Sequence, residues 1–121
     1  MNDNAKEWVA ALRSGEYSQG TGHLYDGINH CCLGVGCRIF GLAARHKVKK
    51  NGDGVWTFNG QDKELPLEVM EWLGLSSLGG NYLINGVFSA LDIDNDDGKT
   101  FAELADIIES EPEGLFMEAQ S

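Results

Sequence analysis

The sequence CCLGVGCRIFGLAA, residues 31–44, decides the fold because apolar or small side chains occupy nearly every position in it. Arg38 is the only charged residue of this stretch. A helix that is apolar on every side is buried on every side, so residues 31–44 are predicted to form a central helix. Gly34, Cys37 and Gly41 lie on one stripe, where their small size lets another backbone approach closely. The large residues expected in the core are Leu33, Val35, Ile39, Phe40 and Leu42.

Helical periodicity and end signals predict three further helices, over residues 3–13, 65–73 and 101–110. The last of these is the best defined. Thr100 and Glu103 have the spacing of a capping box, in which each side chain bonds to the backbone of the other residue.

Residues 47–58 are predicted to form a β-hairpin, because the Asn-Gly and Asp-Gly pairs within them are strong turn signals. Residues 75–90 favour neither a helix nor a strand. The predicted fold class is therefore α+β: one small domain over residues 1–121, with about four helices around a buried central helix and a β-hairpin. The acidic tail at residues 112–121 begins with a proline and is expected to be loose.

Size and composition indicate a cytoplasmic protein. The chain has 121 residues, of which 42% are apolar, and this is the size of one ordinary domain. It lacks both an apolar run of about 18 residues and the basic and apolar regions of a signal peptide. Its three cysteines, an odd number within residues 31–37, favour a reducing compartment over disulfide bonds.

The net charge of −10 is distributed unevenly along the chain. Residues 1–50 sum to +3, residues 51–90 to −4 and residues 91–121 to −9. An acidic chain repels phosphate backbones, so direct nucleic-acid binding is not expected, although the basic first half leaves room for a local patch. The acidity favours solubility, and it also offers a negative surface to a basic partner.

The cluster of His30, Cys31, Cys32 and Cys37 contains residue types that bind zinc. Structural zinc usually takes two separated pairs of ligands, and the chain has no second cysteine pair. Adjacent helical residues also point about 100° apart, so Cys31 and Cys32 do not easily face one ion. Free cysteines are commonly buried packing residues, and we favour that interpretation for all three.

A cysteine hydrolase is the alternative for the same cluster. A thiol in the first turn of a helix feels the positive helix end, which lowers its pKa. Cys31 or Cys32 would then be the nucleophile, with His30 or His23 as the base. The order of residues disfavours this alternative, because no histidine follows His46 and the usual order places the base after the cysteine.

A calcium loop is suggested by Asp92, Asp94, Asp96 and Glu103, which stand at offsets 1, 3, 5 and 12 of an EF-hand. Asp97 occupies offset 6, where the sharp turn requires glycine, so the match is partial. We favour an acidic turn followed by a capped helix. No other cofactor is expected.

Four segments together resemble a family of small, functionally uncharacterised proteins encoded by bacteriophages and prophages. They are WVAALRSGEY at residues 8–17, CCLGVGC at 31–37, EWLGL at 71–75 and NDDGKTFAELAD at 95–106. The resemblance covers most of the chain and contains no catalytic signature. It implies a phage origin and a location in the host bacterial cytoplasm, and it implies no residue roles.

The sequence therefore predicts a small acidic accessory protein that is not an enzyme and that binds a host or phage protein as an inhibitor or modulator. Small size, the lack of a convincing catalytic set and the polarised charge support this prediction. The alternatives are the hydrolase on Cys31 or Cys32 and a calcium-stabilised structural module.

Overall fold

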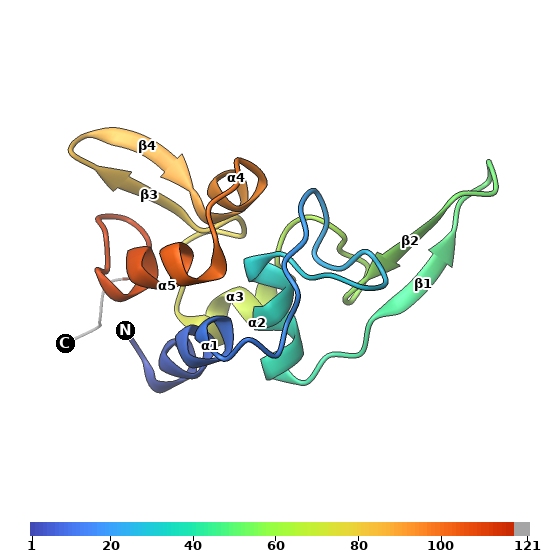
Figure 1. Cartoon of the computed structure of the whole chain (residues 1–121), viewed down its shortest axis with the longest axis horizontal. Helices are drawn as coiled ribbons and strands as arrows, with labels where there is room; N and C mark the ends of the chain where they lie inside the picture. The colour runs from blue at the N-terminus through green and yellow to red at the C-terminus, as the bar shows by residue number, and fades with distance from the viewer. Residues whose placement is uncertain (118–121) are drawn as a thin grey trace.

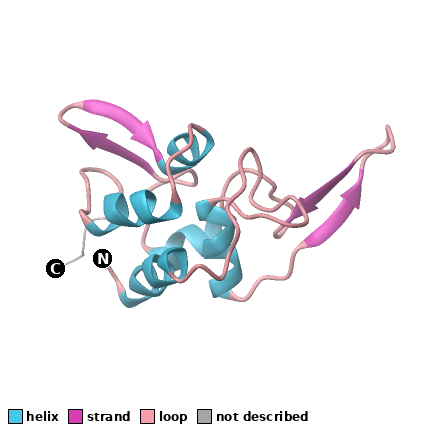
Figure 2. Cartoon of the chain, viewed as in Figure 1, coloured by secondary structure: helices cyan, strands magenta, loops and turns pink. Residues whose placement is uncertain are grey.

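The computed structural model describes residues 1–117, which form five helices and two antiparallel β-hairpins (Figures 1 and 2). The predicted α+β fold of a small domain is confirmed. In chain order the elements are α1 (Asp3–Arg13), α2 (Cys32–Phe40), β1 (Arg45–Val48), β2 (Gly54–Thr57), α3 (Leu67–Leu73), β3 (Asn81–Ile84), β4 (Val87–Ala90), α4 (Leu91–Asp96) and α5 (Phe101–Glu109).

Helix α2 is the centre of the core, as predicted, and it contacts α1, α3 and α4. Its residues 32–37 are all buried. The indole Nε1 of Trp8, a fully buried residue of α1, donates a hydrogen bond of 2.8 Å to the Cys32 carbonyl. Helix α1 also packs on α5, so the first and last helices close the same side of the core.

The central helix is shorter than the predicted residues 31–44. It ends at Phe40 because Gly41 adopts a left-handed conformation, with φ of 104°. Leu33 and Val35 are fully buried, as predicted. The prediction that Ile39, Phe40 and Leu42 are buried is wrong. These three side chains are half-buried, because the last turn of α2 emerges from the core.

Gly34 confirms the predicted close approach of another backbone to α2. A Cβ atom on Gly34 would lie 1.8 Å from the carbonyl oxygen of Leu24. The neighbouring segment is the loop before α2, whose Leu24 carbonyl also accepts a hydrogen bond of 3.2 Å from Cys31 N–H. Gly41 does not allow such a close approach, since a Cβ atom on Gly41 would have no other atom within 4 Å.

Two hairpins extend from opposite ends of the helical body (Figure 1). The predicted hairpin is confirmed as β1–β2, with Arg45 opposite Thr57 and Val48 opposite Gly54. The second hairpin, β3–β4, lies in the stretch that the sequence left undecided. Asn85 and Gly86 form its turn with φ of 52° and 76°, the positive values that tight hairpin turns require.

The acidic segment after β4 forms the short helix α4, and the predicted capping box at Thr100 and Glu103 then begins α5. The prediction of a loose tail is wrong for residues 112–117. Leu115 is fully buried, and Leu83 N–H of β3 donates a hydrogen bond of 2.8 Å to the Glu113 carbonyl. Residues 118–121 of the predicted tail lie outside the described residues.

None of the helices within residues 1–117 is long and apolar enough to cross a membrane.

Candidate functional site

The three cysteines are buried in and before α2, where their thiols pack against apolar neighbours. Burial raises the pKa of Cys31 to about 11, and the pKa of Cys32 lies well above its ordinary value for the same reason. The backbone N–H groups of Leu33 and Gly34 favour a Cys31 thiolate, but they do not outweigh the desolvation. The thiols are therefore protonated at neutral pH.

His30 is held by aromatic rings and by Arg38 rather than by a cysteine. Its ring stacks on Tyr25 with centroids 4.5 Å apart, and it meets the Tyr17 ring edge-on at 5.3 Å. Arg38 Nε donates a hydrogen bond of 3.1 Å to His30 Nε2, so the proton of the neutral ring is on Nδ1. Burial, followed by the charge of Arg38, lowers the pKa of His30 to about 4. His30 therefore remains neutral at physiological pH.

Cys31 and His23 are the two catalytic candidates that the structure brings together. Both line a cavity of about 190 Å³ that also contains Lys63, Asp92 and Asp96. His23 Nδ1 lies 3.6 Å from a carboxylate oxygen of Asp62, which could orient its ring. Cys32 and His30 are not among the residues that line this cavity.

The calcium candidates do not converge, because Asp92, Asp94 and Asp96 lie on a helix rather than in an EF-hand loop. Asp92 and Asp96 face the cavity. Asp94 instead accepts hydrogen bonds from the Tyr82 and Ser89 hydroxyls of β3 and β4. Glu103 caps α5. Within residues 1–117, no group of three or more His, Cys, Asp and Glu side chains could hold a metal ion.

Asn95 is a structural centre that the sequence interpretation missed. It is completely buried, and its Oδ1 accepts hydrogen bonds from Cys32 N–H at 3.1 Å and from the Gln19 side chain at 2.9 Å. Its Nδ2 donates to the Gly20 carbonyl at 2.7 Å. One amide thereby joins α4 to the start of α2 and to the loop before it. The available signal was a single uncharged polar residue within a run of aspartates.

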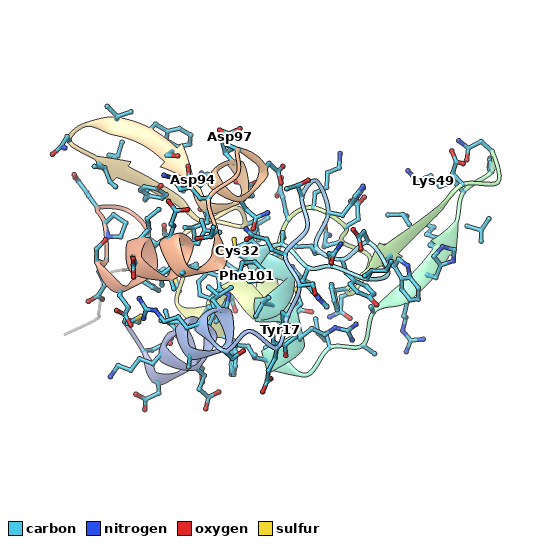
Figure 3. The ribbon with its side chains drawn as sticks, viewed as in Figure 1. Tyr17, Cys32, Lys49, Asp94, Asp97 and Phe101 are labelled. Atoms are coloured by element: carbon cyan, nitrogen blue, oxygen red, sulfur yellow. The ribbon has the colours of Figure 1, made fainter. Side chains whose placement is uncertain are left out.

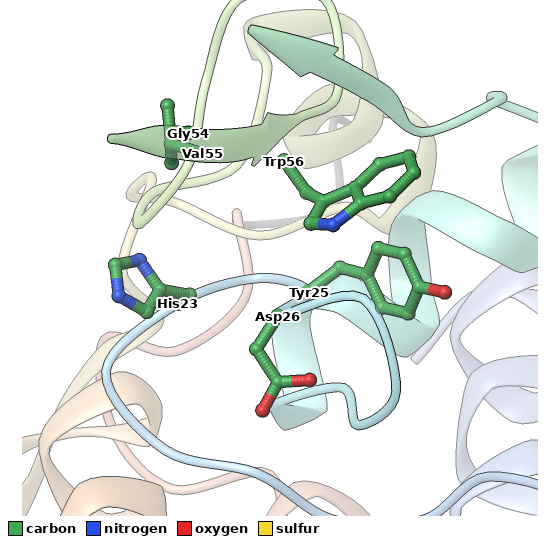
Figure 4. Close-up of a pocket in the computed structure, with 6 residues that line it drawn as sticks. All are labelled: His23, Tyr25, Asp26, Gly54, Val55 and Trp56. Carbon is green, nitrogen blue, oxygen red and sulfur yellow. The ribbon is translucent and has the colours of Figure 1, made fainter. Parts of the chain in front are cut away.

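A small recess of about 100 Å³ lies where the β1–β2 hairpin joins the body (Figure 4). The rings of Tyr25 and Trp56 meet edge to face in its wall, with centroids 5.3 Å apart. His23 and Asp26 add polar groups from the loop before α2. The recess is too small for a typical organic ligand, and its aromatic contacts hold the base of the hairpin in place.

The β3–β4 hairpin exposes large apolar side chains near its turn. Ile84, Val87 and Phe88 are 45%, 68% and 60% exposed, and we call these three residues the β3–β4 tip. Ile93 on the adjacent helix α4 is also 47% exposed. Exposed apolar side chains that cluster on one element mark interaction sites more often than scattered ones do.

One acidic group lies beside the β3–β4 tip, and others lie on α4 at the opposite end of the hairpin. Asp96 and Asp97 are exposed at the end of α4, and the exposed Glu113 lies on the segment that pairs with β3. Residues 91–117 as a whole sum to −8. Figure 3 shows Asp94 and Asp97 on α4, at the body end of the β3–β4 hairpin, with Lys49 near the opposite end of the molecule. The tip is therefore an apolar surface on an acidic part of the chain, with Glu113 beside it.

The comparisons place the chain within a known sequence family. The family model described as Domain of unknown function (DUF8296) matches residues 1–112. The chain belongs to the DUF8296 family. In this DUF8296 domain, the matched region runs from α1 through α5 and includes the cavity, Asn95 and the β3–β4 tip. Comparisons with curated proteins and with solved structures gave no significant match.

Proposed function

We propose that this DUF8296 protein is a small, non-enzymatic accessory factor of phage type that binds a host or phage protein in the bacterial cytoplasm. The β3–β4 tip is the proposed contact, and the exposure of its three large apolar side chains carries the proposal. Burying this area against a partner would supply the main favourable free energy of association.

The charge around the tip favours a basic partner. Glu113, beside the tip, would lie at the rim of the interface, and the exposed carboxylates at the end of α4 would add longer-range attraction for basic side chains, which speeds association. The proposed partner therefore presents an apolar pocket bordered by lysine or arginine. Such binding would inhibit or modulate the partner without any chemistry at the cysteines.

The test is affinity capture from phage-infected host cells with quantitative mass spectrometry. The tip variant carries Val87→Ser and Phe88→Ser. The matched control carries Ile28→Ser and Val48→Ser, because these two apolar residues are also well exposed, at 81% and 64%, but lie outside the tip. The wild type and the control should capture the same partner protein. The amount captured by the tip variant should be about tenfold lower. Equal recovery by all three proteins would contradict the proposal.

A hydrolase based on Cys31 is the second candidate, and it is supported by the cavity that Cys31 shares with His23. The raised pKa of the thiol opposes it, because a resting nucleophile needs a thiolate or a base that removes its proton. Iodoacetamide labelling followed by peptide mapping separates the two candidates. Slow labelling of native Cys31 relative to the unfolded protein supports the binding protein, and fast selective labelling at neutral pH supports the hydrolase.

A further inference from the structure

The β1–β2 hairpin has a charge opposite to that of the rest of the molecule. We call residues 45–57 the basic arm. It contains four exposed basic side chains against one acidic side chain, and it sums to +3 while the other residues sum to −13. Among the described residues, none of its basic side chains forms an ion pair. The four basic residues are Arg45, Lys47, Lys49 and Lys50.

The arm is far from the acidic end. It extends along the long axis of the molecule, away from α4 and β3–β4 (Figures 1 and 3). A four-residue strand rises about 13 Å, whereas the Debye length at physiological ionic strength is about 8 Å. Lys49 and Lys50 at the turn are thus largely screened from the carboxylates of α4 and of the segment at Glu113. Asp26 is the body carboxylate that lies nearer, in the recess beside Gly54 and Val55. The net charge of −10 does not describe the potential at the arm.

The base of the arm is rigidly placed. Trp56 of β2 contacts the Tyr25 ring, and the His46 ring of β1 lies against Trp56 with centroids 5.1 Å apart. Phe58, directly after β2, is fully buried. A partner therefore meets a pair of strands whose base is already in place, which lowers the entropic cost of binding.

The composition of the arm favours a polyphosphate partner over a protein. Protein–protein interfaces are depleted in lysine, whereas protein–DNA interfaces are strongly positive. Val48 is the only large apolar side chain of the arm that is mostly exposed. A two-stranded ribbon also has the dimensions that fit the major groove of B-DNA. We propose that the basic arm binds duplex DNA through phosphate contacts, independently of the β3–β4 tip.

The experiment measures fluorescence anisotropy of a labelled duplex of about 30 base pairs with the full-length protein, from 50 to 200 mM salt. The arm variant replaces three lysines by glutamine: Lys47→Gln, Lys49→Gln and Lys50→Gln. The control replaces three exposed body lysines: Lys6→Gln, Lys63→Gln and Lys99→Gln. Both variants reach the same net charge of −13, so only the position of the lost charge differs.

We expect the wild type to bind at 50 mM salt. A plot of the logarithm of the association constant against the logarithm of the salt concentration should have a slope of about −3 to −4 if four basic groups contact phosphates. The arm variant should lose affinity at least about tenfold, and the control less than about threefold. Absence of wild-type binding at 50 mM salt, or equal losses in the two variants, would overturn the proposal. A poly-glutamate peptide that binds the arm as tightly as the duplex would also overturn it, and would assign the arm to an acidic protein.

Discussion

Asn95 shows how a single buried amide determines the arrangement around α2. A buried polar group is stabilising only when its hydrogen bonds are made, and Asn95 uses both its oxygen and its nitrogen. Neighbouring Asp94 is also mostly buried and is satisfied by two hydroxyls. The run of aspartates, which resembles a calcium loop in sequence, therefore contains residues with internal structural roles.

Asn95→Ala should lower the free energy of unfolding by about 2–4 kcal/mol, because it leaves Cys32 N–H and the Gly20 carbonyl without their partner. The control is Asn81→Ala, which changes the same residue type at an exposed position and should cost less than about 0.5 kcal/mol. Urea unfolding measures both values. Equal stability of the two variants would show that the Asn95 hydrogen bonds are not important for the fold.

His30 predicts a pH dependence of stability. Its folded-state pKa of about 4 lies below the ordinary value of 6.5, so the unfolded chain binds the proton more readily. The contribution of His30 to the free energy of unfolding is fully present above pH 6.5 and is lost as the pH falls towards 4. The free energy of unfolding should fall by no more than about 3 kcal/mol through this residue.

Unfolding free energies measured between pH 7 and pH 4.5 test this dependence. His30→Gln should flatten the fall in stability relative to the wild type, whereas His46→Gln should retain it because His46 is exposed on the arm. A fall that is identical in both variants would assign the pH dependence to other groups.

At the scale of the elements, local signals predicted structure where the stabilising contacts are themselves local. The capping box at Thr100 and Glu103 and the β1–β2 turn were both evident from short sequences. The β3–β4 hairpin was not, because its apolar strands also fit a helix and only the Asn85-Gly86 pair indicated a turn. Helix α4 depends on contacts with β3, β4 and the loop before α2, which sequence periodicity does not contain.

The candidate site also depends on contacts between segments that are distant in sequence. The sequence indicated Cys31 and His23 as candidates, but not that both line one cavity while His30 turns towards Arg38. The emergence of the chain from the core after Cys37 was equally hidden, since residues 39–44 are as apolar as the buried part of α2. These outcomes follow from how distant segments pack.

The contact between α2 and the preceding loop predicts a large effect of Gly34→Ala. The new methyl group would overlap the Leu24 carbonyl, which is backbone and cannot turn aside as a side chain can. We expect Gly34→Ala to lower the free energy of unfolding by at least about 3 kcal/mol, or to prevent folding.

Gly36→Ala is the matched control in the same helix. Its nearest neighbour is the end of the Leu73 side chain at 3.1 Å, which can move, and the helix gains up to about 1 kcal/mol from replacing glycine. Thermal unfolding of the two variants compares the sites directly. If Gly34→Ala melts no lower than Gly36→Ala, the close approach of loop and helix is absent in solution.

Charge and exposed apolar surface are distributed unevenly along the molecule. The β3–β4 hairpin, which carries the apolar tip, lies at one end, and the basic arm lies at the other (Figure 1). The sum of charges for each part of the chain was available from the sequence, but the separation of those parts in space was not. Two surfaces of different chemistry on one small domain suit a protein that acts by contact.

The most direct test of the proposed function places the photo-crosslinking residue p-benzoylphenylalanine at Phe88 of the tip and, separately, at Val48 of the arm. Both positions are well exposed, at 60% and 64%, so they sample solvent equally. Irradiation of phage-infected cells should give one specific protein adduct from position 88, and that adduct should be absent from position 48. No adduct at position 88, or the same adducts at both positions, would contradict the assignment of the β3–β4 tip as the partner-binding surface.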